Sequence, residues 1–108
     1  MIMISMPMNY YGWRTTYADI KNRLEQQGYK VAPLTYKELY GKREPDLVEG
    51  LKIQTIPLLY MAHAFIRMSL CDTVYFVTGW ETARGCRLEH QAAQDYGLKI
   101  IYEEPSTN

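Results

Sequence analysis

The sequence predicts an α/β fold, in which a parallel sheet of about four strands is covered by helices on both faces. Short apolar runs alternate with stretches of helical periodicity, and short connections join them. The run at 73–78 is continuously rich in β-forming residues, as in the central strand of a parallel sheet. Right-handed crossovers restrict the topology, and we expect the strand order 2-1-3-4. With 108 residues, 47% of them hydrophobic, the chain is expected to form one domain, 1–108, with a polar tail at 103–108.

The four strands are expected where apolar and β-branched residues form short runs. The first run, 2–5, is apolar throughout and ends at a Met-Pro-Met segment, and the run at 73–78 is the clearest strand. Loose alternation over 30–36 predicts another strand, which Pro33 places at a sheet edge because proline lacks a backbone N–H. The last strand is expected at 98–102.

Three longer segments have the periodicity of helices. Tyr17, Ile20 and Leu24 lie on one face of a helix that should begin near residue 16 and end before Gly28. The other expected elements are two helices, at 56–70 and 83–96, and an irregular segment with at most a short helix, at 37–50. In the helix at 56–70, apolar residues occur nearly all round the axis, which indicates burial on more than one side.

Composition and charge restrict the classes of function. Twelve basic and twelve acidic residues leave no net charge, which argues against the basic surface of a nucleic-acid-binding protein. No apolar run reaches the roughly 20 residues that span a bilayer, and the first residues do not resemble a secretory signal. Cys71 and Cys86 are expected to be free thiols in the cytoplasm. Since the cysteines and histidines lack ligand spacing, neither a metal nor another cofactor is expected.

Two loops follow expected parallel strands and are therefore candidate sites, since ligands of such sheets bind beyond the carboxyl ends of the strands. These loops are 5–14 and 79–87. The second runs into a helix whose first N–H groups would attract an anion, and Gly85 would allow close approach to the backbone. One turn later, Glu89 would point over the same pocket, where a carboxylate can attack an anomeric carbon. From spacing alone, a surface glutamate paired with Arg84 is the more common arrangement.

The segment 79–90, Gly-Trp-Glu-Thr-Ala-Arg-Gly-Cys-Arg-Leu-Glu-His, closely resembles a motif of a small bacteriophage and bacterial family that is similar to a reduced nucleoside 2-deoxyribosyltransferase. A weaker likeness covers the opening Ile-Ser-Met-Pro-Met and the segments 70–76 and 96–101. The resemblance implies a flavodoxin-like three-layer sandwich and a pocket for a nucleoside or nucleotide. In the deoxyribosyltransferases, a Gly-x-x-x-Glu element supplies the glutamate that bonds to C1′ of the sugar, and Gly85 and Glu89 occupy those positions here.

The chain departs from the deoxyribosyltransferases where they handle the base. Ala83 replaces an aspartate six residues before the glutamate, and Gln91 replaces a glycine two residues after it. The region 60–65, where a second aspartate would lie, holds no carboxylate. His63 and Glu81 are the conceivable substitutes as proton donors to the leaving base. The residues therefore support binding more than catalysis.

We expect a nucleoside- or nucleotide-binding protein, with N-glycosidic cleavage or deoxyribosyl transfer through Glu89 as the chemistry that the resemblance implies. The expected binding residues are Ser5, Met6, Pro7, Met8, Trp80, Glu81, Arg84 and Gly85. The alternatives are a non-catalytic protein that sequesters a nucleotide and a phage-encoded protein-interaction module. A pocket built by so short a chain would be open, so we expect a homodimer or larger assembly. The expected location is the cytoplasm of a bacterium or of a phage-infected host, with no membrane or nucleic acid as partner.

Overall fold

The computed structural model describes residues 1–41 and 48–104. The elements follow one another in the order β1 (Ile2–Ser5), α1 (Trp13–Gln26), α2 (Tyr36–Tyr40), α3 (Ile56–Ser69), β2 (Thr73–Phe76), a 3₁₀ turn (Trp80–Thr82), α4 (Arg84–Asp95) and β3 (Lys99–Tyr102). Within these residues, no helix has the length and apolar character needed to cross a membrane. Parts of the expected loop, 42–47, and of the expected tail, 105–108, lie outside the described residues.

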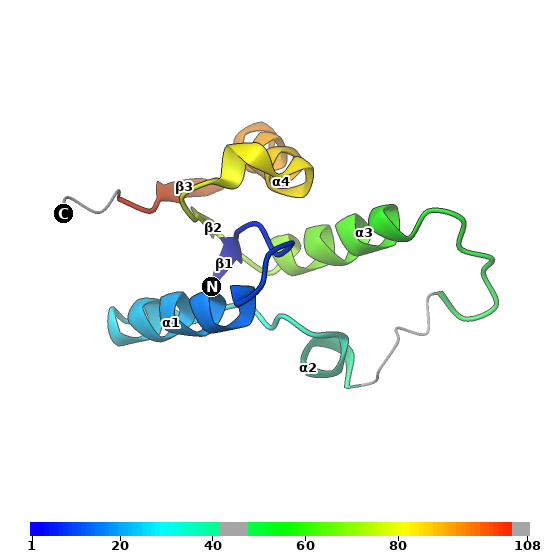
Figure 1. Ribbon diagram of the computed structural model, residues 1–108, viewed down its shortest axis with the longest axis horizontal. Coiled ribbons are helices and arrows are strands. Elements are labelled where there is room, and N and C mark those ends of the chain that lie inside the picture. Colours follow the sequence, from blue (N-terminus) through cyan, green and yellow to red (C-terminus); the bar gives the residue numbers. More distant parts are fainter. Residues whose placement is uncertain (42–47, 105–108) are drawn as a thin grey trace.

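The three strands form one parallel sheet with the order β1-β2-β3, which confirms the α/β class (Figure 1). Ile2 pairs with Thr73 at one end of the β1–β2 ladder, and Ser5 pairs with Phe76 at the other. The β2–β3 ladder continues in register to Tyr102. The carboxyl ends of all three strands therefore meet at one edge of the sheet.

The strand predicted at 30–36 is reduced to a single parallel bridge between Val31 and Ile2, so the described sheet has three strands rather than about four. Only Lys30 and Ala32 add backbone hydrogen bonds to Ile2, both 2.8 Å long. Pro33 then ends the pairing because it has no N–H to donate. Moreover, the carbonyl oxygens of Pro33 and Leu34 accept hydrogen bonds from α3 side chains instead of from a neighbouring strand.

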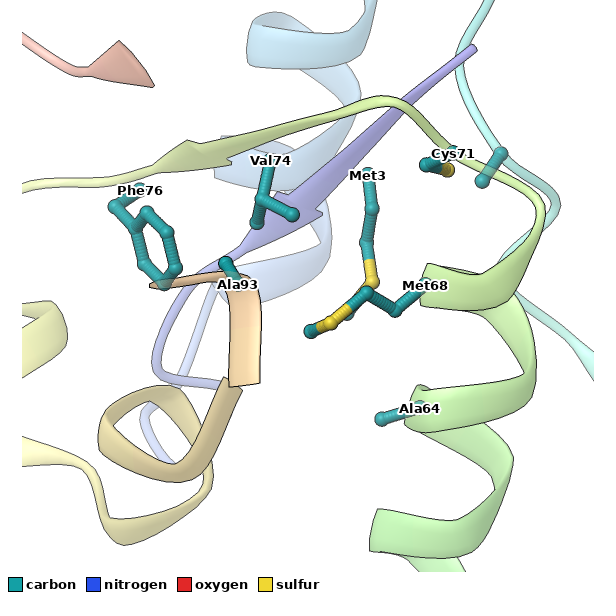
Figure 2. Close-up of a cluster of buried hydrophobic side chains, with 8 residues drawn as sticks. Met3, Ala64, Met68, Cys71, Val74, Phe76 and Ala93 are labelled. Atoms are coloured by element: carbon teal, nitrogen blue, oxygen red, sulfur yellow. The ribbon is translucent and has the colours of Figure 1, made fainter. Parts of the chain in front are cut away.

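Helices cover both faces of the sheet, and each face has its own hydrophobic core. On one face, α1 packs Tyr17, Ile20 and Leu24 against Ile2 and Ile4 of β1. On the other, side chains of β1 and β2 pack against α3 and α4, as Figure 2 shows. The residues of this second cluster are Met3, Ala32, Ala64, Met68, Cys71, Val74, Phe76 and Ala93. Residues neighbouring along a strand alternate between the clusters, as the pleat requires.

Two helices differ from their predicted form. Helix α1 begins at Trp13, three residues earlier than expected, because Gly12 precedes it in the left-handed region at φ 88°. Helix α3 has the expected bounds to within one residue, but burial on more than one side is wrong for its first half. Only Ala64, Arg67 and Met68 are buried, all in the second half. The first half extends away from the sheet (Figure 1), and Ile56, Leu58 and Tyr60 are exposed there.

Candidate functional site

A cavity of about 250 Å³ lies where β1 ends, between its carboxyl end and helices α3 and α4. Ile4, Met6 and Met8 line it from β1 and the loop that follows. The segment at Val31, which comes next along the chain, pairs with one edge of β1, whereas β2, which comes later, pairs with the other edge. The cavity therefore lies where connections diverge to opposite sides, the position at which open α/β sheets bind ligands.

Glu89 of α4 lines this cavity with a carboxyl group that is held in place. The side chain is 8% exposed, and Oε1 accepts a hydrogen bond of 2.8 Å from Oγ of Ser5, the last residue of β1. Burial raises the pKa of Glu89, while the Ser5 hydrogen bond and the charge of Arg67 oppose the rise. The hydrogen bond joins two residues 84 positions apart, so the structure brings Ser5 and Glu89, both expected at the site, side by side.

Cys86 lies one turn before Glu89 on the same buried face of α4. The thiol is free, and burial raises its pKa to about 11. It is therefore protonated at neutral pH and a poor nucleophile. This agrees with a packing role for the cysteine.

His63 of α3 faces the cavity from the opposite wall. Its Nε2 lies 3.0 Å from the carbonyl oxygen of Leu34 and must donate, because a carbonyl oxygen can only accept. Burial lowers the pKa of His63, and the charge of Arg67 lowers it further. The rings of Tyr36 and Tyr40 pack against the imidazole, with centroids 4.2 and 5.8 Å away. A neutral His63 whose only N–H is already bonded is a poor proton donor to a ligand.

Arg67, one turn after His63, is the residue that the sequence analysis missed. It lines the cavity although it is only 4% exposed, and its Nε donates to the carbonyl oxygen of Pro33 at 2.8 Å. A signal was present, because Arg67 is the single charged residue in the apolar segment 56–70. Nothing in the sequence, however, indicates which side of α3 turns toward the sheet.

Trp80 and Glu81 do not line this cavity, so the structure does not bring them together with Glu89. They line a separate groove of about 340 Å³ beyond the ends of β2 and β3. The 3₁₀ turn that starts at Gly79, with φ 94°, directs them toward β3. There the Trp80 ring stacks on His90 at 4.2 Å, and His90 is hydrogen-bonded to the Tyr102 hydroxyl.

Four other predicted binding residues, Ser5, Pro7, Arg84 and Gly85, are not part of the cavity wall, although Ser5 contacts it through Glu89. Arg84 is exposed at the start of α4, because the first helical position points away from the sheet. A Cβ atom on Gly85 would lie 3.3 Å from Sδ of Met61, which lines the cavity from α3. Gly85 thus allows α4 to pack closely on α3, and it shapes the cavity without contacting its contents.

Comparison with known proteins places the chain in a family. The family described as "Domain of unknown function (DUF4406)" matches residues 8–102. The chain belongs to this family. The match includes Met8, Arg67 and Glu89, whereas Ser5 precedes it.

A curated protein also matches part of this DUF4406 chain. RNA-binding protein 15 of Homo sapiens is 41% identical over 51 residues, which cover 44% of the chain. The matched part is only 5% of the length of that human protein. No solved structure matches the chain significantly.

Proposed function

We propose that the chain binds a nucleoside or nucleotide in the cavity at the end of β1, with Glu89 at the sugar. The observation that carries the proposal is the buried carboxyl group of Glu89, which Ser5 orients on the cavity wall. Burying such a group costs free energy, so positions of this kind are frequent in functional sites. The resemblance of 79–90 to the deoxyribosyltransferase-like family supports a nucleoside as the ligand.

The finer details of the fold belong to the same proposal. In a four-stranded flavodoxin-like sheet of order 2-1-3-4, the second strand would lie beside β1. The Val31 bridge to Ile2 supports this arrangement. We also place the protein in the cytoplasm of a bacterium or phage-infected host, where nucleotides are abundant and thiols stay reduced.

Glycosidic bond cleavage is the chemistry that Glu89 would serve. The carboxylate would form a bond to C1′ while the bond from C1′ to the base nitrogen breaks, and the base would leave with the electron pair. The base nitrogen then needs a proton. His63 does not offer its N–H to the cavity, and Arg67 does not release a proton near neutral pH. The described wall residues therefore favour binding, with base release or deoxyribosyl transfer as the second candidate activity.

RNA binding is not part of the proposal. The similarity to the human RNA-binding protein covers 5% of that protein, and this chain has no net charge. Affinity for nucleic acid rests largely on lysine and arginine contacts to phosphates, which usually give such a domain an excess of positive charge.

The test is incubation of the protein with nucleosides, deoxynucleosides and their monophosphates, followed by liquid chromatography with mass detection. Free base from the wild type but not from Glu89→Gln would establish a glycosidase or transferase, and Glu25→Gln on α1 is the matched control. A ligand that stays bound through desalting without turnover would establish a binding protein. If neither product nor bound ligand appears, the proposal fails and a protein-interaction module is favoured.

A homo-oligomer is the assembly that we propose, with the first half of α3 as its interface. Leu58 is 65% exposed and Tyr60 is 61% exposed, and in 56–70 only the buried Arg67 is charged. In a second copy of the chain, the first half of α3 offers the same apolar surface, so the two surfaces could pack against each other. Tyr60 also lines the cavity, so the interface would adjoin the site and close its open side.

Leu58→Lys is expected to convert the oligomer into a monomer, because a charge at a buried apolar interface is costly. Light scattering coupled to size-exclusion chromatography measures the mass directly. Leu88→Lys is the matched control, since Leu88 is a comparably exposed leucine on α4. A wild-type protein that is already monomeric at high concentration would contradict this prediction.

A further inference from the structure

We infer that Arg67 binds an anionic group of the ligand, so that the ligand is a nucleotide bearing a phosphate rather than a free nucleoside. The inference rests on the proposed function, because it specifies the class of molecule that the same cavity accepts. It is carried by the position of a buried guanidinium group on the cavity wall, without a counter-ion among residues 1–41 and 48–104.

The hydrogen bonds within the protein account for only part of the Arg67 side chain. An arginine has five N–H donors. The Nε–H is bonded to Pro33, but Nη2 is buried and has no partner among residues 1–41 and 48–104. The hydroxyl of Tyr17 on α1 interacts with Arg67, but burial raises its pKa and it supplies no negative charge. A buried guanidinium nitrogen without an acceptor in that part of the chain thus belongs to a residue that lines the cavity.

The charge of Arg67 is likewise unbalanced locally. A guanidinium stays protonated in proteins, so its burial must be compensated by a partner. Over the described ranges, the ion pairs involve other groups, and no carboxylate lies within 4.0 Å of Arg67. Holding the loop at Pro33 through a single hydrogen bond does not require a charged side chain.

Glu89 is not the missing counter-ion, because its Oε1 is bonded to Ser5 and it forms no ion pair with Arg67. The positive charge nevertheless acts on groups from three helices, since it opposes the pKa rise that burial causes in Glu89 and Tyr17 and adds to the fall in His63. Arg67 is therefore close enough to polar groups of three helices to act on them electrostatically. A ligand with a negative charge would supply the counter-ion that Arg67 lacks among the described residues.

Phosphate is the anion that this arrangement suits. The planar guanidinium can donate two parallel N–H groups to two phosphate oxygens, which a single ammonium cannot do. With the sugar at Glu89, the phosphate of a nucleotide supplies such an anion within the same molecule. Arg84, which was expected among the binding residues, does not offer this contact in the cavity, because it is exposed and outside the cavity wall.

The test is isothermal titration calorimetry with nucleosides and their 5′-monophosphates, on the wild type and on Arg67→Gln, Arg67→Lys and Arg84→Gln. We expect the wild type to bind a monophosphate at least about tenfold more tightly than its nucleoside, a ratio equivalent to about 1.4 kcal/mol. Arg67→Gln should bring this ratio near one, whereas Arg67→Lys should keep part of it and Arg84→Gln all of it. Circular dichroism verifies that each variant is folded.

The inference is overturned if the wild type binds nucleosides as tightly as monophosphates, a result that needs no variant. It is also overturned if the ratio survives in folded Arg67→Gln or is lost in Arg84→Gln. Inorganic phosphate separates this inference from the proposed function. If phosphate raises the melting temperature of the wild type but not of Arg67→Gln, while no nucleoside derivative binds, the anion site stands and the proposed function fails.

Discussion

Replacing Glu89 with glutamine is expected to stabilise the folded protein at neutral pH. Burial raises the pKa of Glu89 above its ordinary value of 4.5, so the folded chain holds the carboxyl proton more tightly than the unfolded chain does. Stability is therefore greatest below the unfolded pKa and falls as the pH rises through the folded pKa. Glutamine has no proton to lose, and its Oε1 can still accept the hydrogen bond from Ser5.

Urea denaturation over a series of pH values measures this effect as the difference in unfolding free energy between Glu89→Gln and the wild type. The difference should grow from pH 4.5 upward and then level off. Its final size should be about 1.4 kcal/mol for each pH unit by which folding raises the pKa of Glu89. When both proteins also carry Ser5→Ala, the difference between them should keep growing to a higher pH, because the Ser5 hydrogen bond that lowers the pKa of Glu89 is then absent. A difference that is flat, or that shrinks with pH, would contradict the burial of the ionised carboxylate.

Phe76→Ala is expected to destabilise the protein by about 3–5 kcal/mol, because it leaves a cavity in the core between the sheet and α4. Phe76 is 0% exposed, and its ring contacts Trp80 and His90 with centroids 5.3 and 4.9 Å away. Domains of this size are stable by only about 5–15 kcal/mol, so the variant should lose much of its stability. Urea denaturation of both proteins gives the difference.

Phe65→Ala is the matched control for this prediction. The same atoms are removed from a side chain that is 40% exposed on α3, so the loss should be clearly smaller than at Phe76. Equal losses for the two variants would mean that Phe76 is not the centre of the core.

Local periodicity predicted most of the helices and strands, but it did not predict that the strand expected at 30–36 would be reduced to one bridge. The helix face of Tyr17, Ile20 and Leu24 is set by spacing alone, and it is buried as expected. The segment 30–36 alternates like a strand. Its carbonyl oxygens at Pro33 and Leu34, however, bond to side chains of α3 some 30 residues away. The spacing of apolar residues within 30–36 does not show that distant side chains compete with a neighbouring strand for these carbonyl oxygens.

Sequence reasoning could indicate those residues of the candidate site whose place depends on their position along a single strand or helix. Glu89 and Ser5 follow from the rule that ligands lie beyond the carboxyl ends of parallel strands. The sequence does not show that Trp80 lies away from Glu89, because a short turn after β2 sets its direction and that turn packs against β3. Arg67 was missed for a related reason, since its role depends on how α3 docks.

The Ser5–Glu89 hydrogen bond also determines when the site can exist during synthesis. Ser5 leaves the ribosome early, but its partner on α4 is made 84 residues later. A nascent chain or a fragment without α4 has neither the carboxylate nor the wall that buries it. If the cavity binds a nucleotide as proposed, a nascent chain would be able to bind it only after α4 has been made and has packed against the end of β1.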